Sequence, residues 1–389
     1  MHADPSQGWN VFKQIFAEHW DGFRRVYPRY DQRYYDGLVH KMLGCGDPEN
    51  MGSIAYRWLH CGEGKPLVSM SCTLSLCLRG AKVYVDNWVS QVSQMLHEGV
   101  SYRHMVLTMP AMVRTTFYHH AGVLLSAFMR CGAQCLDDVF SRVSRRTLQR
   151  DSIVVTQTHG RHGQYNPHLH CIATSGGWDQ QARQWIHLDY LPDSMRRKKW
   201  QWHLLTMVRQ TVKTKETKRL VDACYTRYRE GFVTNVHKGD VPSRYQSLAT
   251  YLAKYVVSPP ISLRRIDRYD GQRVTYHYRS HKSERVEQET VEVSTFIGRM
   301  VQHVFPKGFK RVRYDGVQAT KTFEKIKIMI HNALAKVKGI MKDAIKIFAA
   351  KSYRERYQAS TGRDPLICPH CKEEMGIWKI WHPKYGVIY

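Results

Sequence analysis

Three short apolar segments, spread widely along the chain, constrain its fold most strongly. Residues 104–108, 152–158 and 168–174 are dominated by apolar and β-branched side chains, which is typical of strands. Helical patterns lie between and after them, over residues 113–129, 136–148 and 193–218. Strands from distant parts of a chain, separated by helices, favour an α+β sandwich whose central sheet is mostly antiparallel.

The remaining sequence predicts more elements and no internal repeat. Further helices are expected over residues 86–100, 243–257 and 323–357, and a β-rich stretch over residues 264–292. A chain of 389 residues, with 43% hydrophobic residues, is long and apolar enough for two or three folded domains.

The charge of the chain points to a polyanionic partner. Lys and Arg number 59 against 33 Asp and Glu, a formal net charge of +26. Such an excess is hard to tolerate without a polyanion, and nucleic acid is the first candidate. A basic protein indifferent to DNA is the alternative. An anionic membrane fits less well, because the basic residues are spread along the whole chain.

The cellular setting follows from what the sequence lacks. The first ten residues show no signal-peptide pattern, and no apolar run approaches 18 residues. We therefore expect a cytoplasmic, nucleoid-associated protein without a membrane partner. In a reducing compartment the ten cysteines are expected to be metal ligands or core thiols.

Two histidines mark the candidate metal centre. His168 and His170 lie two apart on a predicted strand, so both rings project from the same face. Two imidazoles on one rigid strand can hold one divalent metal ion. In a chain with 21 histidines this pattern alone is a weak signal.

A pair of tyrosines supplies candidate nucleophiles. Tyr251 and Tyr255 lie four apart on a predicted helix, so their hydroxyls share one face, with Lys254 beside them. A phenolate can attack a metal-polarised phosphodiester and leave a 5′ phosphotyrosine link. The alternative is an ordinary helix in which both tyrosines belong to the buried stripe.

Basic and aromatic residues alternate in the predicted helix over residues 193–218. Basic side chains that contact phosphates, next to aromatic rings that stack on bases, are typical of single-stranded nucleic-acid binding. A solvated basic face with Trp200 and Trp202 turned into the core explains the pattern equally well. The basic candidates for DNA binding are Arg196, Arg197, Lys198 and Lys199.

Cysteines cluster near both ends of the chain. Residues 40–80 are rich in Gly, Pro and Ser, as small metal-bound modules are. The candidate zinc ligands there are Cys45, Cys61, Cys72 and Cys77, and the tail adds Cys368 and Cys371.

Four blocks of sequence, in this order, resemble a known family. They are SCTLSLC, THGRHGQYNPHLHCIATSGG, YLAKYVVSPPIS and HVFPKGFKRVRYDG. Together they are similar to the rolling-circle insertion-sequence transposases of the IS-ninety-one type, which have a two-tyrosine HUH (His-hydrophobic-His) nuclease domain and an N-terminal zinc-binding region. The resemblance covers residues 40–389.

The resemblance implies a role for each matching residue. His168 and His170 would bind magnesium or manganese, and Tyr251 and Tyr255 would be the first and second nucleophiles. HUH sites usually take a third polar ligand, for which Gln157 is preferred over His159, the two sharing a face of the preceding strand. Lys254 would offset phosphate charge or lower the phenol pKa.

The cysteine module departs from the family pattern. Similar proteins have two Cys-x-x-Cys knuckles, whereas Trp58 and Gly80 replace one cysteine of each. We therefore expect at most one zinc ion there, bound chiefly by Cys61, Cys72 and Cys77, with Cys45 as the fourth ligand. His40 or His60 could substitute, and a metal-free module is the alternative. His382 or an N-terminal cysteine would complete the tail pair.

The combined prediction is an α+β HUH endonuclease sandwich with a zinc-ribbon-like N-terminal module and a basic C-terminal region. The expected boundaries are 1–95, 96–262 and 263–389. The predicted function is a metal-dependent transposase that nicks and joins single-stranded element ends and target DNA through a 5′ phosphotyrosine. The sequence is compatible with a homo-oligomer and does not determine the oligomeric state. A replication initiator or relaxase with the same chemistry, and an inactive DNA-binding relative, are the alternatives. A metal-dependent oxidoreductase would leave the charge unexplained.

Overall fold

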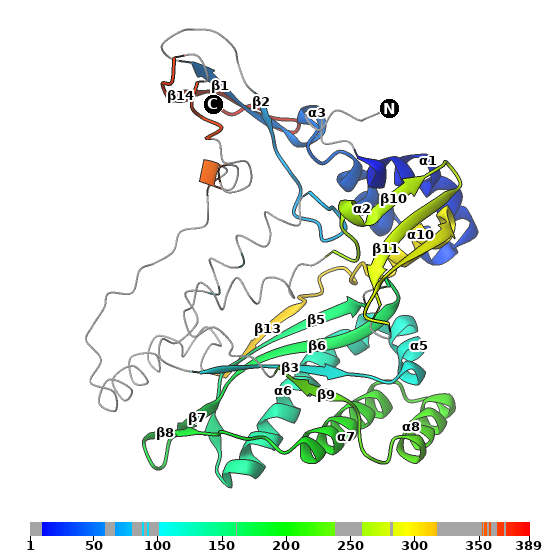
Figure 1. Ribbon diagram of the computed structural model, residues 1–389, viewed down its shortest axis with the longest axis vertical. Coiled ribbons are helices and arrows are strands. Elements are labelled where there is room, and N and C mark those ends of the chain that lie inside the picture. Colours follow the sequence, from blue (N-terminus) through cyan, green and yellow to red (C-terminus); the bar gives the residue numbers. More distant parts are fainter. Residues whose placement is uncertain are drawn as a thin grey trace.

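Figure 1 shows the computed structural model of the chain. The structure describes residues 10–58, 67–79, 88, 92, 101–160, 162–237, 259–280, 283–316, 352, 354–355, 358, 364–368 and 371–389. Within these residues its helices and strands form two large hydrophobic cores and four antiparallel sheets.

The central sheet has the strands that the apolar segments predict. β3 (Tyr102–Thr108), β5 (Ser152–His159) and β6 (Tyr165–Thr174) are its three longest strands. Two short strands, β9 (Thr234–Val236) and β13 (Val312–Asp315), complete the order β13-β5-β6-β3-β9. Every neighbouring pair is antiparallel. The predicted α+β class with an antiparallel sheet is confirmed.

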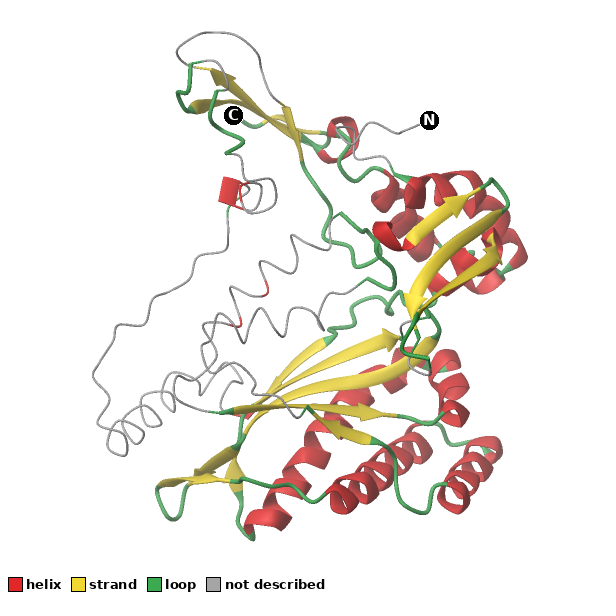
Figure 2. Ribbon diagram, in the orientation of Figure 1, coloured by secondary structure: helices red, strands yellow, loops and turns green. Residues whose placement is uncertain are grey.

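Helices cover one face of this sheet (Figure 2). They are α5 (Ala111–His119), α6 (Ala121–Ser144), α7 (Asp193–Thr211) and α8 (Lys215–Arg227). Leu107 and Leu169 point from the sheet into the same buried cluster as Phe128 and Trp200. The alternation of side chains along each strand then directs the intervening residues to the opposite face.

Two predicted helix boundaries are wrong. The first helix ends at His119, and α6 then runs through to Ser144, because its buried residues keep a helical period across Cys131, Cys135 and Val139. The expected helix over residues 193–218 is divided in two. The Thr214 side chain accepts a hydrogen bond from the Thr217 amide and so begins α8 as an N-cap.

A small sheet extends the far end of the central layer. It consists of β4 (Leu148–Gln149), β7 (Gly176–Asp179) and β8 (Gln184–His187). A Cβ atom at Gly176 would meet the carbonyl oxygen of Ile186 at 2.0 Å, so only glycine allows this close strand approach.

The second core joins segments from near the start of the chain to segments after residue 260. The early segments are α1 (Val11–Val26), η2 (Pro28–Tyr30) and α2 (Arg33–Leu43). They pack against a later group of elements, which are η3 (Leu263–Arg265), β10 (Ile266–Tyr269), β11 (Arg273–Arg279), β12 (Val286–Glu292) and α10 (Val293–Val301). Phe12 and Phe296 meet edge to face there, with ring centroids 6.2 Å apart. The β-rich stretch predicted over residues 264–292 is confirmed.

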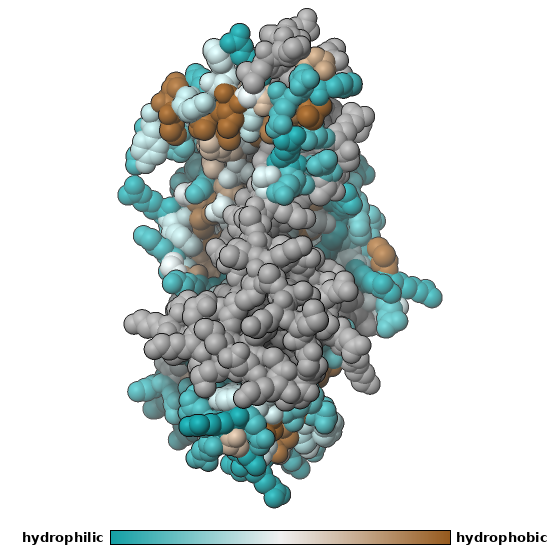
Figure 3. Space-filling view, turned by 90° about the vertical axis from the view of Figure 1, so that its left-hand side faces the viewer, coloured by the Kyte–Doolittle hydropathy of each residue, from teal (hydrophilic) through white to brown (hydrophobic). Residues whose placement is uncertain are grey.

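A further sheet joins the two ends of the chain. After α3 (Pro48–Met51), β1 (Ser53–Trp58) lies between β2 (Leu67–Ser69) and β14 (Met375–His382), and β15 (Gly386–Val387) forms the edge. Apolar atoms gather near the top of the molecule, where this sheet lies (Figure 3). Ile377 and Val387 are among its exposed apolar side chains.

These contacts cross the boundaries of the three expected chain regions. Residues after 263 form part of the second core, pack against the first core, and supply strands to three of the sheets. The boundaries at 95 and 262 stay predictions. The helices expected over residues 86–100 and 323–357 lie mostly outside the described residues, and the one over residues 243–257 lies entirely outside them. Among the described helices, none is long and apolar enough to cross a membrane.

Candidate metal centre

Adjacent strands bring the expected metal ligands together. In the antiparallel register, Gln157 of β5 lies opposite His168 of β6, and Val155 lies opposite His170. All three polar side chains therefore project from the face opposite the described helices α5 to α8. The two-residue period of the strand predicts that Gln157 and His159 share a face, and the structure places Gln157 beside both histidines.

Three atoms converge at this point. The Oε1 atom of Gln157 lies 2.9 Å from Nε2 of His168 and 3.0 Å from Nε2 of His170. The two Nε2 atoms are 3.1 Å apart. Octahedral Mg²⁺ holds its ligands at about 2.1 Å, so neighbouring ligands of one ion are about 3.0 Å from each other. The spacing of the three atoms fits such an ion.

The protonation state of His168 indicates that two of the converging atoms are both acceptors. Its Nδ1 donates a hydrogen bond to the backbone oxygen of Asn166 at 2.7 Å, because a carbonyl oxygen can only accept. Burial lowers the pKa values of His168 and His170, which favours neutral rings. A neutral His168 then directs the lone pair of Nε2 toward the Gln157 oxygen, another acceptor. A cation between them would satisfy both atoms.

His104 is a buried residue of this site that the sequence did not identify. Its Nε2 lies 2.9 Å from Nδ1 of His170, on the side of that ring away from Gln157. Burial, together with nearby His237 and His168, lowers the pKa of His104 to about 4. The sequence marks residue 104 only as the start of an apolar strand. Its neighbour on β6 depends on strand register, which no local pattern contains.

His159, the alternative third ligand, has a different position. The register of β5 against β6 shifts between Gln157 and His159, so the simple alternation ends there. The Nε2 atom of His159 lies 3.3 Å from the Gln157 amide nitrogen, at the opposite end of that amide from His168 and His170.

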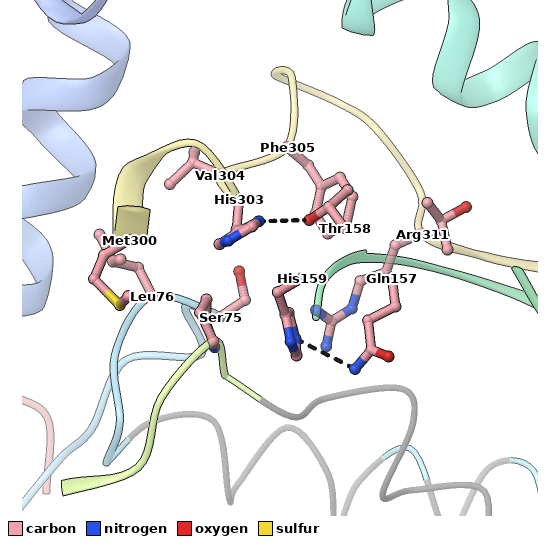
Figure 4. Close-up of a pocket in the computed structure, with 12 residues that line it drawn as sticks. Ser75, Leu76, Gln157, Thr158, His159, Met300, His303, Val304, Phe305 and Arg311 are labelled. Atoms are coloured by element: carbon pink, nitrogen blue, oxygen red, sulfur yellow. Dashed lines mark hydrogen bonds between the residues drawn. The ribbon is translucent and has the colours of Figure 1, made fainter. Parts of the chain in front are cut away.

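A pocket adjoins this end of β5 (Figure 4). Gln157, Thr158 and His159 line it together with Ser75 from the N-terminal part and Arg311 from the segment before β13. Within its wall, Thr158 donates its hydroxyl proton to Nδ1 of His303, whose Nε2–H donates to the Gly163 oxygen at 2.9 Å. Segments far apart in sequence thus meet beside the candidate metal ligands.

A second cluster of metal-binding side chains lies in the N-terminal part. The Sγ atoms of Cys45, Cys72 and Cys77 are buried and lie within 4.8 Å of one another. Tetrahedral zinc with bonds of about 2.3 Å keeps its sulfur ligands about 3.8 Å apart, so the three thiols fit one zinc ion. His40 is exposed and its Nδ1 contacts Asp36, so it takes no part in this cluster. Cys61 and His60 lie outside the described residues.

A buried lysine accompanies the cysteines. The Lys13 amine donates a hydrogen bond to the backbone oxygen of Cys45 and is 2% exposed. Burial lowers the pKa of Lys13, and its interaction with the Cys45 and Cys77 thiols acts in the opposite direction. Three thiolates around one Zn²⁺ carry a net negative charge, which the ammonium group of the adjacent Lys13 would balance.

Comparison with known protein families matches both parts of the chain. A family described as "Transposase zinc-binding domain" matches residues 15–109, which include the cysteine cluster. A family described as "Putative transposase" matches residues 152–325, which include Gln157, His168 and His170. The chain belongs to the IS-ninety-one-type transposases. It is thus a transposase-family chain with an N-terminal zinc-binding domain.

Two curated relatives of this transposase support the assignment. The transposase for insertion sequence element IS801 from Pseudomonas savastanoi pv. phaseolicola is 26% identical over 315 residues, covering 76% of this chain and 73% of the relative. The "Putative transposase y4qJ" of Sinorhizobium fredii (strain NBRC 101917 / NGR234) is 22% identical over 331 residues, covering 80% and 81%. No solved structure matches the transposase significantly.

The four expected DNA-binding residues of the transposase lie on α7, on the helical side of the central sheet (Figure 2). Arg196 and Arg197 both pair with Asp193, and Lys199 contacts Asp138 at 2.7 Å, whereas Lys198 is exposed. Trp200 is buried in the core, and Trp202 is 52% exposed. The cluster therefore faces away from the candidate metal ligands, and its contact with DNA stays a prediction.

The expected nucleophiles of the transposase are not placed. Tyr251, Lys254 and Tyr255 lie outside the described residues, although the family match over residues 152–325 includes all three.

Proposed function

We propose that this transposase nicks and joins single-stranded DNA, with a divalent metal ion at Gln157, His168 and His170 and with Tyr251 and Tyr255 as nucleophiles. The observation that carries the proposal is the convergence of three electron-pair donors within 3.1 Å of one another on the sheet face opposite the described helices. Magnesium or manganese bound there would polarise the scissile phosphate and stabilise the charge that develops on it.

The side chains of the site have separate tasks in this proposal. The rigid pair of strands holds His168 and His170 at fixed spacing, so the ligands need little rearrangement when the ion binds. The Asn166 carbonyl and His104 orient the two rings from outside the ligand set. The neighbouring pocket, with Arg311 and Ser75, offers polar groups to a phosphate beside the ion.

The bond changes follow from tyrosine chemistry. The Tyr251 phenol loses its proton and its oxygen attacks phosphorus, while the bond to the 3′ oxygen breaks and that oxygen takes up a proton. A 5′ phosphotyrosine and a free 3′ hydroxyl result. Attack of a target strand's 3′ hydroxyl on this link restores a phosphodiester and frees the tyrosine. Tyr255 would perform the second cleavage, and Lys254 would offset phosphate charge.

The wider proposal includes the architecture and the partners. The central sheet with helices on one face is consistent with an HUH sandwich, with the regions 1–95, 96–262 and 263–389 as its divisions. Zinc would occupy the cluster of Cys45, Cys72 and Cys77. The net charge of +26 suits single-stranded element ends and target DNA in the bacterial cytoplasm. A homo-oligomer could hold two DNA ends at once.

Covalent capture tests the proposal. Purified transposase is incubated with labelled single strands carrying the element ends, with Mn²⁺ or with a chelator, and separated on a denaturing gel. We expect a labelled protein band that needs both the metal and the correct end sequence. A folded protein that binds the strand, yet forms no adduct and leaves the strand intact, would favour the inactive DNA-binding relative. Joining of donor to target DNA in the same tube separates a transposase from a replication initiator or relaxase.

A further inference from the structure

A cavity lies between the two cores of the molecule, at the end of the central sheet where β6 begins. Its volume is about 570 Å³, within the range of about 300–1,000 Å³ that is usual for pockets that hold small organic ligands. Exposed Gln32 and His119 border it and buried Leu125 and Val301 close its base, so it opens to solvent. Its wall comes from η2, α2, the corner between α5 and α6, β6, and the segment that follows α10.

Aromatic rings dominate this cavity, which we call the tyrosine cavity. Its five tyrosines are Tyr30, Tyr34, Tyr35, Tyr118 and Tyr165. The hydroxyls of Tyr30 and Tyr118 share a hydrogen bond at 2.7 Å, and the Tyr34 hydroxyl donates to the Phe305 oxygen at 2.8 Å. Tyr165 meets Tyr118 edge to face, with ring centroids 5.4 Å apart. Because these contacts fix the rings before a ligand arrives, binding needs little further ordering of side chains.

The charged groups of the tyrosine cavity are cations. Arg29 lies over the Tyr118 ring, with its Cζ atom 3.8 Å from the ring centroid, and it donates to the Tyr118 backbone oxygen at 2.7 Å. Lys307 adds a second positive charge at the exposed rim. No Asp or Glu occurs among the described residues that line the cavity. Aromatic surface next to positive charge suits a flat, π-rich ligand that carries an anion.

Tyr165 offers a hydrogen-bond donor to such a ligand. Its phenol interacts electrostatically with Arg29 and Tyr118, so its hydroxyl is directed toward other lining residues of the cavity. Burial raises the pKa of Tyr165, which keeps the phenol protonated. Within the part of the chain that the structure describes, this buried hydroxyl has no hydrogen-bond partner, which is uncommon in proteins. An acceptor on the edge of a nucleobase would satisfy it.

The tyrosine cavity adjoins the pocket beside the candidate metal ligands. Thr158 and His303 line both of them. Figure 4 shows the hydrogen bond that joins these two side chains, with Gln157 nearby. Tyr165 and His168 are three residues apart on β6, about 10 Å along an extended strand. A DNA strand held at the metal ion could therefore place a neighbouring base in the cavity.

We propose that the tyrosine cavity takes up one unstacked base of single-stranded DNA, close to the phosphate at the metal ion. The base would stack on the tyrosine rings and accept a hydrogen bond from Tyr165, while Arg29 and Lys307 would attract the adjoining phosphates. The bases of a duplex are paired and stacked, so the cavity favours a single strand. The inference rests on the proposed single-stranded substrate. It does not depend on cleavage, since binding alone fills the cavity.

Abasic-site scanning tests the inference. Full-length protein with Tyr251→Phe and Tyr255→Phe is used, so that binding to an element-end strand is measured with Mn²⁺ and without cleavage. Each base is removed in turn, which leaves the backbone charge unchanged. We expect the loss of one particular base to weaken binding by about 10-fold, the loss of one stacking contact. Adding Tyr118→Leu should abolish this penalty at that position, because the two changes remove the same interaction.

The matched control is Tyr190→Leu, which replaces a tyrosine that is 68% exposed and outside the cavity. This variant should keep the full penalty. Equal affinity for every abasic strand, or a penalty that persists in Tyr118→Leu, overturns the cavity site and leaves the proposed function standing. A wild-type protein that binds no single strand would refute the proposed function as well.

Photocrosslinking of the wild-type protein covers variants that fail to fold. Iodouracil is placed at each position of the strand in turn, the complex is irradiated, and the attached peptide is identified by mass spectrometry. We expect one position, or two adjacent ones, to crosslink to Tyr34, Tyr118 or Phe305. Crosslinks that all map outside the cavity, in a protein that binds the strand tightly, would refute the site.

Discussion

The Nε2 atom of His104 lies 2.9 Å from the Nδ1 atom of His170, across the paired strands β3 and β6. When Nε2 of His170 faces a metal ion, its only proton is on Nδ1, which then donates to His104. His104 thereby selects the tautomer of His170 and fixes the plane of its ring. In the proposed site it is a positioning residue, since it would act on a bound metal ion through another side chain.

Removing this hydrogen bond should weaken metal binding specifically. We expect His104→Ala to lower the affinity for Mn²⁺ by about 10- to 100-fold, because an outer partner no longer orients His170. His104→Gln should recover part of the loss, since its side-chain oxygen can accept the same proton. Mn²⁺ titration followed by electron paramagnetic resonance measures the effect, with exposed His187→Ala as the control. Wild-type Mn²⁺ affinity in a folded His104→Ala protein would contradict the positioning role.

The ligands themselves should separate cleavage from DNA binding. His168→Ala or His170→Ala is expected to abolish cleavage while keeping most of the affinity for single-stranded DNA, because that affinity comes from dispersed Lys and Arg contacts with phosphate. Binding should weaken steeply with salt in wild type and variants alike. Cleavage assays and salt-dependent binding curves test both statements. Undiminished cleavage by chelator-treated protein would refute the metal role.

The two tyrosines should be needed for successive steps. We expect Tyr251→Phe and Tyr255→Phe each to abolish transposition without changing the fold, because phenylalanine keeps the ring and loses only the nucleophilic oxygen. Adduct mapping by mass spectrometry should find the first nick on Tyr251. Circular dichroism provides the control for folding. Full transposition by both variants would remove the tyrosines from the mechanism.

Acid should destabilise the fold through His303. Burial lowers the pKa of His303 to about 4, whereas an unfolded histidine titrates near 6.5. Between these pH values the unfolded chain binds a proton that the folded chain does not, so the free energy of unfolding falls as the pH is lowered. Protonation of this one side chain lowers the free energy of unfolding by about 3 kcal/mol at most. Urea unfolding of wild type and His303→Gln at several pH values should give a shallower fall for the variant, and parallel curves would contradict the assignment.

Restoring the missing cysteines should strengthen zinc binding. Trp58→Cys together with Gly80→Cys supplies the ligands that similar proteins have, and each added thiolate contributes to folding energy. We expect tighter zinc retention against a chelator and a higher unfolding temperature in the same protein. Trp58→Ser with Gly80→Ser is the control without thiols. Equal zinc retention in the two double variants would show that neither position reaches a metal.

The central sheet was predictable because its three long strands have strong local signals. Residues 104–108, 152–158 and 168–174 are apolar enough to be recognised singly, and their strands end within three residues of the predicted limits. β9 and β13 have three and four residues, and they form only because the rest of the sheet offers them an edge. No window of sequence of that length contains such a signal.

The candidate site shows the same division between local and long-range information. Gln157 and His159 could both be selected as candidate third ligands because the period of a strand is a local property. His104 could not, because its place beside His170 depends on how β3 aligns with β6. The pairing of β1 with β14 joins residues more than 300 positions apart, and for that reason the sequence predicted a separate N-terminal module.

That pairing also sets an order of events during synthesis. β14 leaves the ribosome more than 300 residues after its partner β1, which at about 5–20 residues per second is a delay of tens of seconds. Until then one edge of β1 has unsatisfied backbone groups, the usual starting point for misassembly with other chains. A truncated copy of the element would encode a chain that never closes this edge, and such products should be recognised by chaperones and proteases before they reach DNA.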